Sequence, residues 1–407
     1  MEPFHVIAIL ITLAAGFAYV NYHFIKMPMT ISLMLLSLVI SAGLIIMEQL
    51  GMPVKHYADQ LVKSIDFKTV LMDGMLGLLL FAGALHVDLN DLAEQKLEIS
   101  VLATIGVITS TLLVGSAVFG LGALLGLKMK FTVCLLFGAL ISPTDPIAVM
   151  GILKKAGAPK SLETKIAGES LFNDGFGVVV FMVLFEVAVG ESHVTPGHVL
   201  ALFVKEVAGG VVFGLVAGYI AYRMLKSVDK YQVEILITLA LVIGSYTLAA
   251  ELHLSAPIAV VLSGLLIGNH GREFAMSDTT RDNLDTFWEL IDEILNALLF
   301  VLIGLEVLVL TLNGQYLLAG AIAVPVALLC RLISVGIPVK IMSRWRTYSP
   351  RAISIMTWGG LRGGISVALA LSLPAECNRE LILTMTYVVV VFSILVQGLT
   401  IKKLVKG

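Results

Sequence analysis

The sequence predicts an all-α integral membrane protein with about thirteen transmembrane helices. A transmembrane helix needs roughly 20 predominantly apolar residues, and about thirteen segments of the chain approach that length. The first reason is composition, because 58% of the 407 residues are hydrophobic and 14% are charged. In soluble domains, by comparison, about 45–50% of residues are apolar and about 25% are charged. The second reason is that apolar segments of spanning length follow one another along the whole chain. The connections between them are short, which leaves no room for a soluble domain.

The expected spans begin close to the N-terminus. No lysine or arginine precedes the first one, so we expect a retained helix rather than a cleaved signal peptide. The ninth is short, which suggests a tilted or partly re-entrant element. The spans are residues 4–22, 28–47, 69–87, 97–126, 131–152, 165–190, 198–225, 231–252, 255–269, 287–311, 315–342, 351–374 and 380–403.

Basic side chains gather on one side of this arrangement. With the N-terminus outside, most lysines and arginines fall in connections on the inner side, among them Lys154, Lys155, Arg344 and Arg346. Because such residues mark cytoplasmic connections, we expect the N-terminus outside and the C-terminus cytoplasmic. The expected location is the cell (inner) membrane.

Charge and cysteine content exclude several kinds of partner. A net charge of −2 gives no indication of a nucleic-acid partner. The three cysteines, Cys134, Cys330 and Cys377, form no CxxC pair, which argues against a disulfide framework or a zinc site. We therefore expect no cofactor.

Ionisable residues at bilayer depth are costly and mark functional sites. Three acids fall within two consecutive spans, 131–152 and 165–190, and two arginines fall within 315–342 and 351–374. The intramembrane ionisable residues are Asp73, Asp145, Glu169, Asp174, Glu306, Arg331 and Arg362.

Span 131–152 contains an acid between two prolines. Pro143 and Pro146 lie on either side of Thr144 and Asp145. Proline removes an amide donor and crowds the preceding turn, and the residue before it avoids helical angles. We expect the helix to be interrupted around 142–146, with the freed carbonyls facing protein or water.

Span 165–190 projects several oxygen donors into one sector. Glu169 and Asn173 are four residues apart, as are Ser170 and Asp174, so each pair lies on one helical face. Carboxylate, amide and hydroxyl oxygens suit a hard cation. The alternative is a hydrogen-bonding cluster between helices, although two buried acids are costly for that purpose alone.

Span 351–374 contains the second expected interruption, where four glycines surround Arg362: Gly359, Gly360, Gly363 and Gly364. The two interrupted spans are the fifth and the twelfth, and an odd offset reverses the direction of crossing. We therefore expect an inverted repeat of spans 1–6 and 8–13, with two discontinuous crossing helices at a mid-membrane binding site. In the seventh span, Gly210, Gly214 and Gly218 favour close helix packing.

Two long motifs carry a resemblance to a known family. The chain resembles bacterial NhaP-type antiporters of the cation:proton antiporter-1 family, over essentially its whole length. That resemblance implies exchange of a monovalent cation for protons across the bilayer, by a homodimer that is a transporter and not an enzyme. The motifs are SPTDPIAVMGILKKAGAPKSLETKIAGESLFNDGFGVVVF and GGLRGGISVALALSLP.

The resemblance also implies a division of the chain. Scaffold and dimerisation helices would come from residues 1–96 and 231–312. The moving core would come from 97–190 and 313–407, with 198–225 as a linker helix.

Roles for individual residues are implied in the same way. Asp174 matches the essential cation and proton carrier, and Thr144, Asp145 and Ser170 match positions of the cation site. Asn173 beside Asp174 is typical of the electroneutral branch.

Other positions would support this site or depart from it. Glu169 and Arg331 match a structural ion pair, while Arg362, Pro143 and Pro146 would support the interrupted helices. One departure is Ala82, where many relatives have an acid; Asp73 and Asp88 are weak substitutes.

These features lead to a mechanistic hypothesis. Burial disfavours the ionised form of a carboxyl group, so Na⁺ and H⁺ can compete for Asp174, and either occupant lets the site cross without a bare charge. Asn173 cannot ionise, which predicts one-for-one exchange. The sequence does not separate Na⁺ from Li⁺ or K⁺, so a K⁺/H⁺ antiporter is the main alternative. A cation channel and an intramembrane aspartyl protease are rivals from other classes, although the protease motifs YD and GxGD do not occur around Asp145 or Asp174.

Overall fold

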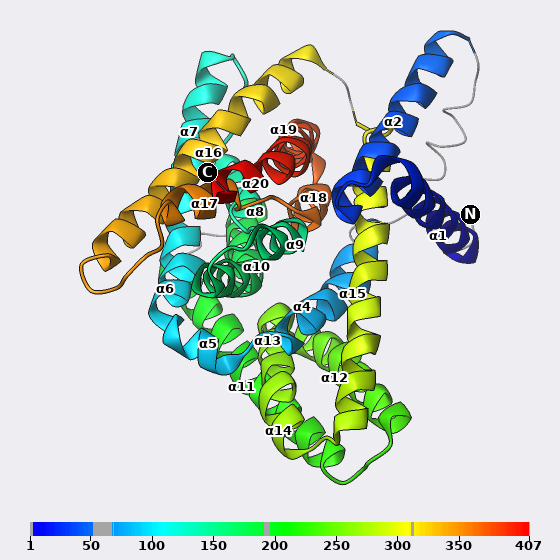
Figure 1. Cartoon of the computed structure of the whole chain (residues 1–407). Helices are drawn as coiled ribbons and strands as arrows, with labels where there is room; N and C mark the ends of the chain where they lie inside the picture. The colour runs from blue at the N-terminus through cyan, green and yellow to red at the C-terminus, as the bar shows by residue number, and fades with distance from the viewer. Residues whose placement is uncertain are drawn as a thin grey trace.

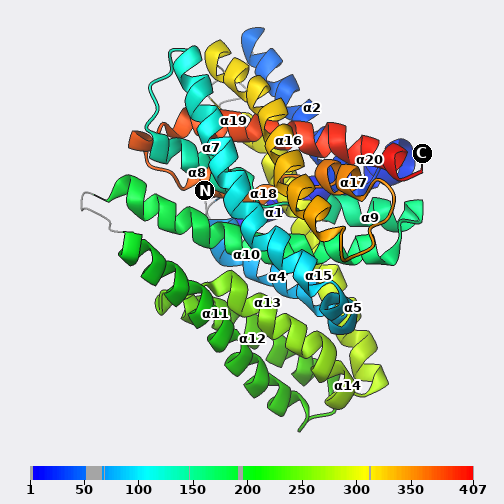
Figure 2. The same cartoon turned by 90° about the vertical axis from the view of Figure 1, so that its left-hand side faces the viewer.

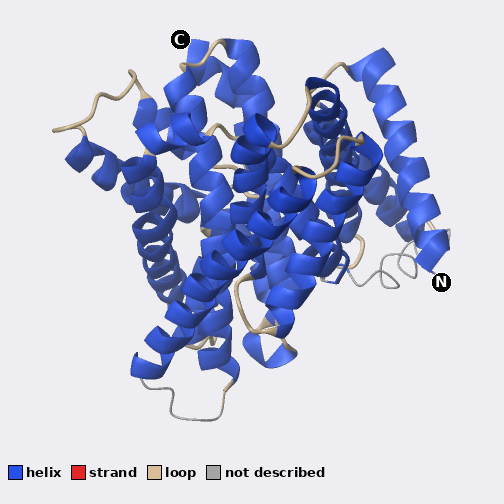
Figure 3. Ribbon diagram, turned by 90° about the horizontal axis from the view of Figure 1, so that it is seen from below, coloured by secondary structure: helices blue, strands red, loops and turns tan. Residues whose placement is uncertain are grey.

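A computed structural model describes residues 3–51, 67, 69–145, 147–190, 196–310 and 313–406. Helices account for nearly all of this part of the chain (Figure 3). Within the described ranges, extended pairing is limited to one isolated antiparallel bridge between Asp145 and Leu361. Pro146, which the sequence analysis names as a helix breaker, lies outside the described residues.

The helices follow one another with short connections. In the first half of the chain they are α1 (Pro3–Val20), α2 (Met29–Gln49), α4 (Leu76–Leu85), α5 (Leu89–Glu94), α6 (Lys96–Val101), α7 (Val107–Leu124), α8 (Phe131–Ile141), α9 (Ile147–Ala156) and α10 (Lys160–Val189). In the second half they are α11 (Pro196–Leu225), α12 (Tyr231–Glu251), α13 (Ala256–Leu266), α14 (Arg272–Phe274), α15 (Asp278–Glu306), α16 (Gly314–Met342), α17 (Ala352–Trp358), α18 (Gly364–Leu371), α19 (Arg379–Phe392) and α20 (Gly398–Lys406). Short π-helical stretches continue several of them, namely η1 (Asn21–Ile25), η2 (Thr69–Met75), η3 (Leu102–Gly106), η4 (Ile267–Gly271) and η6 (Ser393–Gln397), and η5 (Ala375–Cys377) is a 3₁₀ turn.

Each expected span coincides with one or two of these helices. Among the described residues, 8 helices are long and apolar enough to cross a membrane, and two shorter apolar helices, Thr69–Leu85 and Phe131–Ile141, accompany them. The helical, multi-pass architecture is thus confirmed. The count of thirteen spans and the inverted repeat remain predictions.

One helix begins well before the span expected from its apolar residues. The tenth span was expected at 287–311, but α15 begins at Asp278, where the hydroxyl of Ser277 caps the helix by accepting from the amide of Thr280. The first turns carry Asp278, Asp282 and Asp285, which are too polar for lipid. Hydropathy therefore located the apolar part of the helix and missed the polar turns that precede it.

The helices contact one another in two groups (Figure 1). One group contains α1, α2, α4 and α11–α15, in which α15 packs on α2 and α13 packs on α4 and α11. The other contains α6–α10 and α16–α20, in which α7 packs on α8 and α16 packs on α19. Figure 2 shows α11 and α12 on one side of the molecule and α7, α16 and α19 on the other, with α10 between them.

The glycine stripe of α11 packs as expected. A methyl group on Gly210, Gly214 or Gly218 would press against the backbone or side chains of α13. This close approach confirms the interpretation of the stripe as a packing surface. Away from that contact α11 is apolar and exposed: only 11% of its most apolar 18 residues are buried.

Candidate functional site

Both expected interruptions are present, and they cross each other. The helix of span five ends at Ile141 and resumes at Ile147, and that of span twelve ends at Trp358 and resumes at Gly364. At the crossing the amide of Asp145 donates a hydrogen bond of 2.8 Å to the carbonyl of Leu361. Each interrupted segment therefore satisfies part of the other's backbone.

Arg362 binds the carbonyl groups that the first interruption frees. Its Nη1 donates to the carbonyl oxygens of Ser142 at 2.5 Å and Pro143 at 2.8 Å. Its own amide donates to Ser393 Oγ at 3.0 Å, and the residue is 3% exposed. Lipid cannot donate hydrogen bonds to these carbonyl groups, and the guanidinium group of Arg362 in the second interruption does so instead.

Two glycines allow this crossing to be tight. A Cβ on Gly363 would lie 2.7 Å from Asp145 Cβ, and one on Gly360 would lie 2.8 Å from Arg331 Nε. Real Cβ atoms do not approach so closely. The glycines of the second interruption therefore serve close packing as well as breaking the helix.

The polar face of α10 lies against the first interruption. Asn173 Nδ2 donates to Thr144 Oγ1 at 2.9 Å, and the amide of Thr144 donates to Asn173 Oδ1 at 3.2 Å. The hydroxyl groups of Thr144 and Ser170 are hydrogen-bonded at 3.0 Å. The structure thus brings Thr144, Ser170 and Asn173 together, as expected.

One turn away, Glu169 and Arg331 form an ion pair. Arg331 Nη1 donates to Glu169 Oε1 at 2.5 Å, and both side chains are buried. Arg331 Nη2 also donates to the carbonyl of Met356 at 3.4 Å. The pair therefore joins α10, α16 and α17 beside the second interruption.

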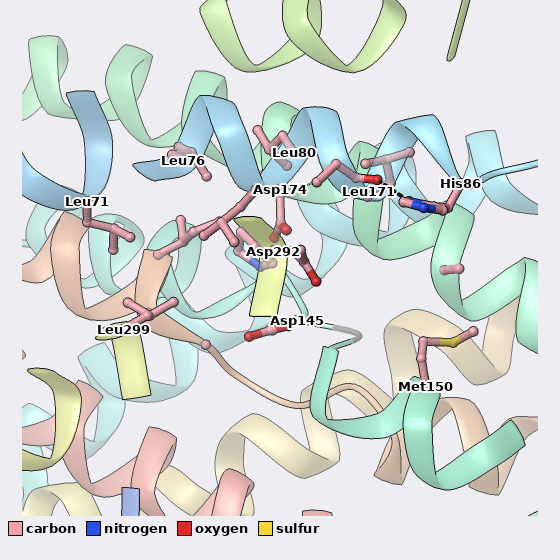
Figure 4. A pocket seen from close by; sticks show the side chains of 18 of the residues that line it. Leu71, Leu76, Leu80, His86, Asp145, Met150, Leu171, Asp174, Asp292 and Leu299 are labelled. Atoms are coloured by element: carbon pink, nitrogen blue, oxygen red, sulfur yellow. Dashed lines mark hydrogen bonds between the residues drawn. The ribbon is translucent and has the colours of Figure 1, made fainter. Parts of the chain in front are cut away.

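A cavity of about 450 Å³, called the site cavity below, lies beside this crossing. Asp174, which is 8% exposed, and Asp145 line it together with Pro143 and Gly363. Figure 4 shows the carboxylates of Asp145 and Asp174 facing the same space from different elements.

The site cavity is open at one end. Its lining includes the buried Leu71 and Leu299 and, farther along the same helices, the exposed His86 and Glu289. The exposed end therefore lies where α4 ends and where α15 is still polar. The two site aspartates lie between this mouth and the buried end.

Two acids that the sequence analysis does not single out also line the site cavity. Glu289 and Asp292 are both on α15, and Asp292 is drawn near Asp174 and Asp145 in Figure 4. Both fall inside the expected span 287–311. Their position within an otherwise apolar segment is the signal that could have identified them.

Other acids named from the sequence lie elsewhere. Asp73 is exposed and Asp88 caps α5 by accepting from the amide of Asn90; neither lines the site cavity. Glu306 is buried at the end of α15, also away from the site cavity. Ala82 does line it, so α4 presents a methyl group at that position.

Within the described ranges, no three His, Cys, Asp or Glu side chains are grouped closely enough to hold a metal ion. The three cysteines are buried and free. A cation at Asp174 and Asp145 would have to complete its coordination with hydroxyl, backbone or water oxygens.

Comparison with known proteins agrees with this geometry. A family model described as sodium/hydrogen exchanger, transmembrane, matches residues 8–407. The chain is 52% identical over 406 residues to the Na⁺/H⁺ antiporter NhaP of Pseudomonas aeruginosa, covering 98% of this chain and 96% of that protein. It is 35% identical over 418 residues to the Na⁺/H⁺ antiporter NhaH of Halobacillus dabanensis, covering 100% of this chain and 99% of that one.

A solved structure shares the fold. The sodium proton antiporter MjNhaP1 from Methanocaldococcus jannaschii, determined at pH 8, superposes with a TM-score of 0.77 at 19% identity, covering 100% of this chain and 99% of that chain. The family match and the relatives exclude an enzyme and indicate a transporter. This multi-pass membrane protein therefore belongs to the sodium/hydrogen exchanger family, as a Na⁺/H⁺ antiporter of the NhaP type.

Proposed function

We propose that this antiporter exchanges one Na⁺ for one H⁺ on a single carboxylate, that of Asp174. The contrast between neighbouring residues on α10 carries the proposal. Asn173 is fully buried and hydrogen-bonded to Thr144, and Glu169 is paired with Arg331. Asp174 instead lines the site cavity. It is therefore the α10 carboxylate that an ion in the site cavity can reach.

The exchange follows from the cost of moving charge through a membrane. With Na⁺ bound, Asp174 is ionised and the pair is neutral; with H⁺ bound, the carboxyl group itself is neutral. An empty, ionised Asp174 carries a bare charge, whose transfer at bilayer depth is costly. The core therefore moves with one occupant or the other, and this requirement couples the two ions.

The proposed Na⁺ ligands are Asp174, Asp145, Ser170 and Thr144. All four provide oxygen atoms, which hard cations prefer. Thr144 and Ser170 already lie together, with their hydroxyl groups 3.0 Å apart. Asn173 holds Thr144 in place from the other side, so its role is to position a ligand.

The stoichiometry follows from the same residues. Asn173 does not ionise, and Glu169 is neutralised by Arg331. One exchangeable charge on α10 therefore remains in each cycle. The proposed exchange is electroneutral, with one Na⁺ for each H⁺.

We further propose that alternating access moves residues 97–190 and 313–407 against residues 1–96 and 231–312, with 198–225 as the linker. The two groups of mutually packed helices support this division. The mouth of the site cavity lies at the end of α4 that leads toward Lys96, on the side that the basic residues assign to the cytoplasm. With the N-terminus outside, the conformation described here is open to the cytoplasm.

A homodimer is also proposed, as the resemblance implies. The exposed apolar side chains of α1 and α2, within residues 1–96, support it, because such a surface must face lipid or a second copy. Crosslinking single cysteines introduced on α1 and α2 in native membranes is the test. Monomeric protein at every position would contradict a dimer through these helices.

Reconstitution tests the carrier assignment. Asp174→Asn in proteoliposomes should abolish Na⁺-driven changes in lumenal pH, while Asp174→Glu, which keeps a carboxylate, should retain part of the exchange. Undiminished exchange by Asp174→Asn would rule out this carrier. For stoichiometry, an imposed membrane potential should leave the equilibrium Na⁺ and H⁺ gradients of the native protein unchanged.

A further inference from the structure

The helix α15 carries an acid that faces the ion-binding carboxylates from the other group of helices. Asp292 lines the site cavity together with Asp145 and Asp174. Figure 4 draws its side chain next to those of Asp174 and Asp145. Asp145 and Asp174 belong to the group of α6–α10, whereas α15 packs on α1, α2, α4 and α12. The site cavity is thus lined with carboxylates from both groups.

Asp292 lies beside the binding residues, between the mouth of the site cavity and its buried end. Glu289, which precedes it by about one helical turn, is exposed at the mouth, and Leu299, farther along, is 3% exposed at the buried end. Asp292 is partly exposed between them. A cation entering through the mouth therefore passes Glu289 first and then meets Asp292 together with Asp145 and Asp174.

No lysine or arginine of the described ranges forms an ion pair with Asp292. This distinguishes it from Glu169, whose charge is balanced by Arg331 at 2.5 Å. An acid at this depth without a fixed counter-charge attracts a mobile cation. Asp292 therefore adds a cation-attracting group on the scaffold side of the Asp174 site.

A second polar group on α15 points to a ligand nearby. Asn296, one turn after Asp292, is 3% exposed; its side-chain amide contacts the Asp292 carboxylate but makes no hydrogen bond of normal geometry among the described residues. Together with Asp292 it lines another cavity of about 600 Å³, bounded by α1, the start of α2, α9 and α15 and called the side cavity below. Buried amide groups are nearly always satisfied, by water or an ion where protein does not suffice. A polar ligand such as water is therefore expected beside Asn296 in the side cavity.

We propose that Asp292 is a stationary capture residue for Na⁺, present on the scaffold and used at one face of the membrane only. This inference rests on the proposed function, because it assumes that the core carries Asp174 away from α15 during exchange. In the conformation described here Asp292 lies beside the carrier and raises the local concentration of cations. After the core has moved, Asp174 is distant from Asp292, and it binds or releases its ion at the other face without the help of Asp292.

The test is a comparison of the two faces. Asp292→Asn removes the charge and keeps the shape of the side chain. Na⁺ dependence is measured in everted and in right-side-out vesicles with a pH dye. We expect the ratio of the two KM values for Na⁺ to change about tenfold, because the loss of one carboxylate affects binding at the site-cavity face alone. This ratio does not depend on the amount of protein in the membrane.

Two further variants separate capture from structure. Asp292→Glu keeps the charge and should leave the ratio within about threefold of the native value. Glu293→Gln removes the next acid on the same helix, which lines the side cavity but not the site cavity, and should leave the ratio unchanged. Raising the ionic strength with choline chloride should shrink the effect of Asp292→Asn, because screening weakens electrostatic capture.

Several results would overturn the inference. An equal change at both faces, no change at either face, or a loss of exchange that Asp292→Glu does not repair would each exclude a one-sided capture residue. These outcomes are distinct from failure of the proposed function, which would be seen as exchange that persists in Asp174→Asn.

Discussion

The two interrupted helices cross at one point but differ in what they contribute. The α8–α9 interruption contains Pro143 and presents Asp145 to the site cavity. The α17–α18 interruption consists largely of glycine and contains Arg362, which is 3% exposed and donates to the carbonyls of Ser142 and Pro143. One interruption offers a carboxylate to an ion, and the other satisfies the backbone that the first leaves open. Binding and stability should therefore respond to different substitutions.

The largest effect on stability is expected where the second interruption is tied to α10. Arg331 binds both Glu169 and the carbonyl of Met356, just before the interruption. Glu169→Gln leaves the arginine buried without its counter-charge, which typically costs about 3–5 kcal/mol. Thermal unfolding of the purified protein in detergent measures the loss.

A double variant provides the control. Removing both partners, as in Glu169→Gln with Arg331→Met, should recover part of the lost stability, because no unpaired charge remains. If the single variant were as stable as the native protein, the pair would not hold the second interruption in place.

The next effect separates the two interruptions directly. Arg362→Met leaves the carbonyls of Ser142 and Pro143 without their donor, at a cost of about 2 kcal/mol or more, since each of the two buried groups loses at least about 1 kcal/mol. Asp145→Asn keeps the shape of the side chain and the backbone hydrogen bond to Leu361, so it should cost less stability than Arg362→Met, while it weakens Na⁺-driven exchange. Both are followed by thermal unfolding and by exchange in proteoliposomes. Equal destabilisation by the two variants would show that both interruptions contribute to stability in the same way.

A smaller effect is expected where the two interruptions touch. Gly363→Ala places a methyl group against the Asp145 carboxylate, and overpacking of this kind costs about 1–3 kcal/mol. Exchange should also fall, because the ligand is displaced. The matched control is Gly336→Ala in α16, where the new Cβ would lie an ordinary 3.6 Å from Ile353 Cγ2. That variant should be at least as stable as the native protein, since alanine favours a helix.

Much of this architecture could be predicted because local patterns determine it. The lengths of the apolar segments predicted the helices. Pro143 and the glycines around Arg362 predicted the interruptions, because proline and glycine destabilise a helix at their own positions. The spacing of Glu169, Ser170, Asn173 and Asp174 showed that they share one sector of a helix. Assigning Arg331 as the partner of Glu169 needed the family resemblance, because 162 positions separate the two residues.

The rest depends on how distant helices turn toward each other. Asp292 lies in an expected span, yet only the packing of α15 determines that its side chain faces the site cavity and not a neighbouring helix. The bonds from Arg362 to carbonyls in the other half of the chain are of the same kind. Another example is Lys165, the first residue of the expected span 165–190, which is buried with its Nζ 3.9 Å from Glu98 Oε1. Helical periodicity does not specify such contacts.

The smallest effect is expected at the hydroxyl group that joins the first interruption to α10. Thr144→Val removes the hydrogen bonds to Asn173 and Ser170 while nearly keeping the volume, and a net loss of about 1 kcal/mol is typical. Because the same hydroxyl group is a proposed Na⁺ ligand, the KM for Na⁺ should rise by more than this small loss of stability explains. Thr144→Ser keeps the hydroxyl group and should stay close to the native KM. Thermal unfolding together with Na⁺ titration of exchange tests both effects. If Thr144→Val and Thr144→Ser shifted KM equally, the methyl group rather than the oxygen would matter, and the first interruption would serve packing instead of binding.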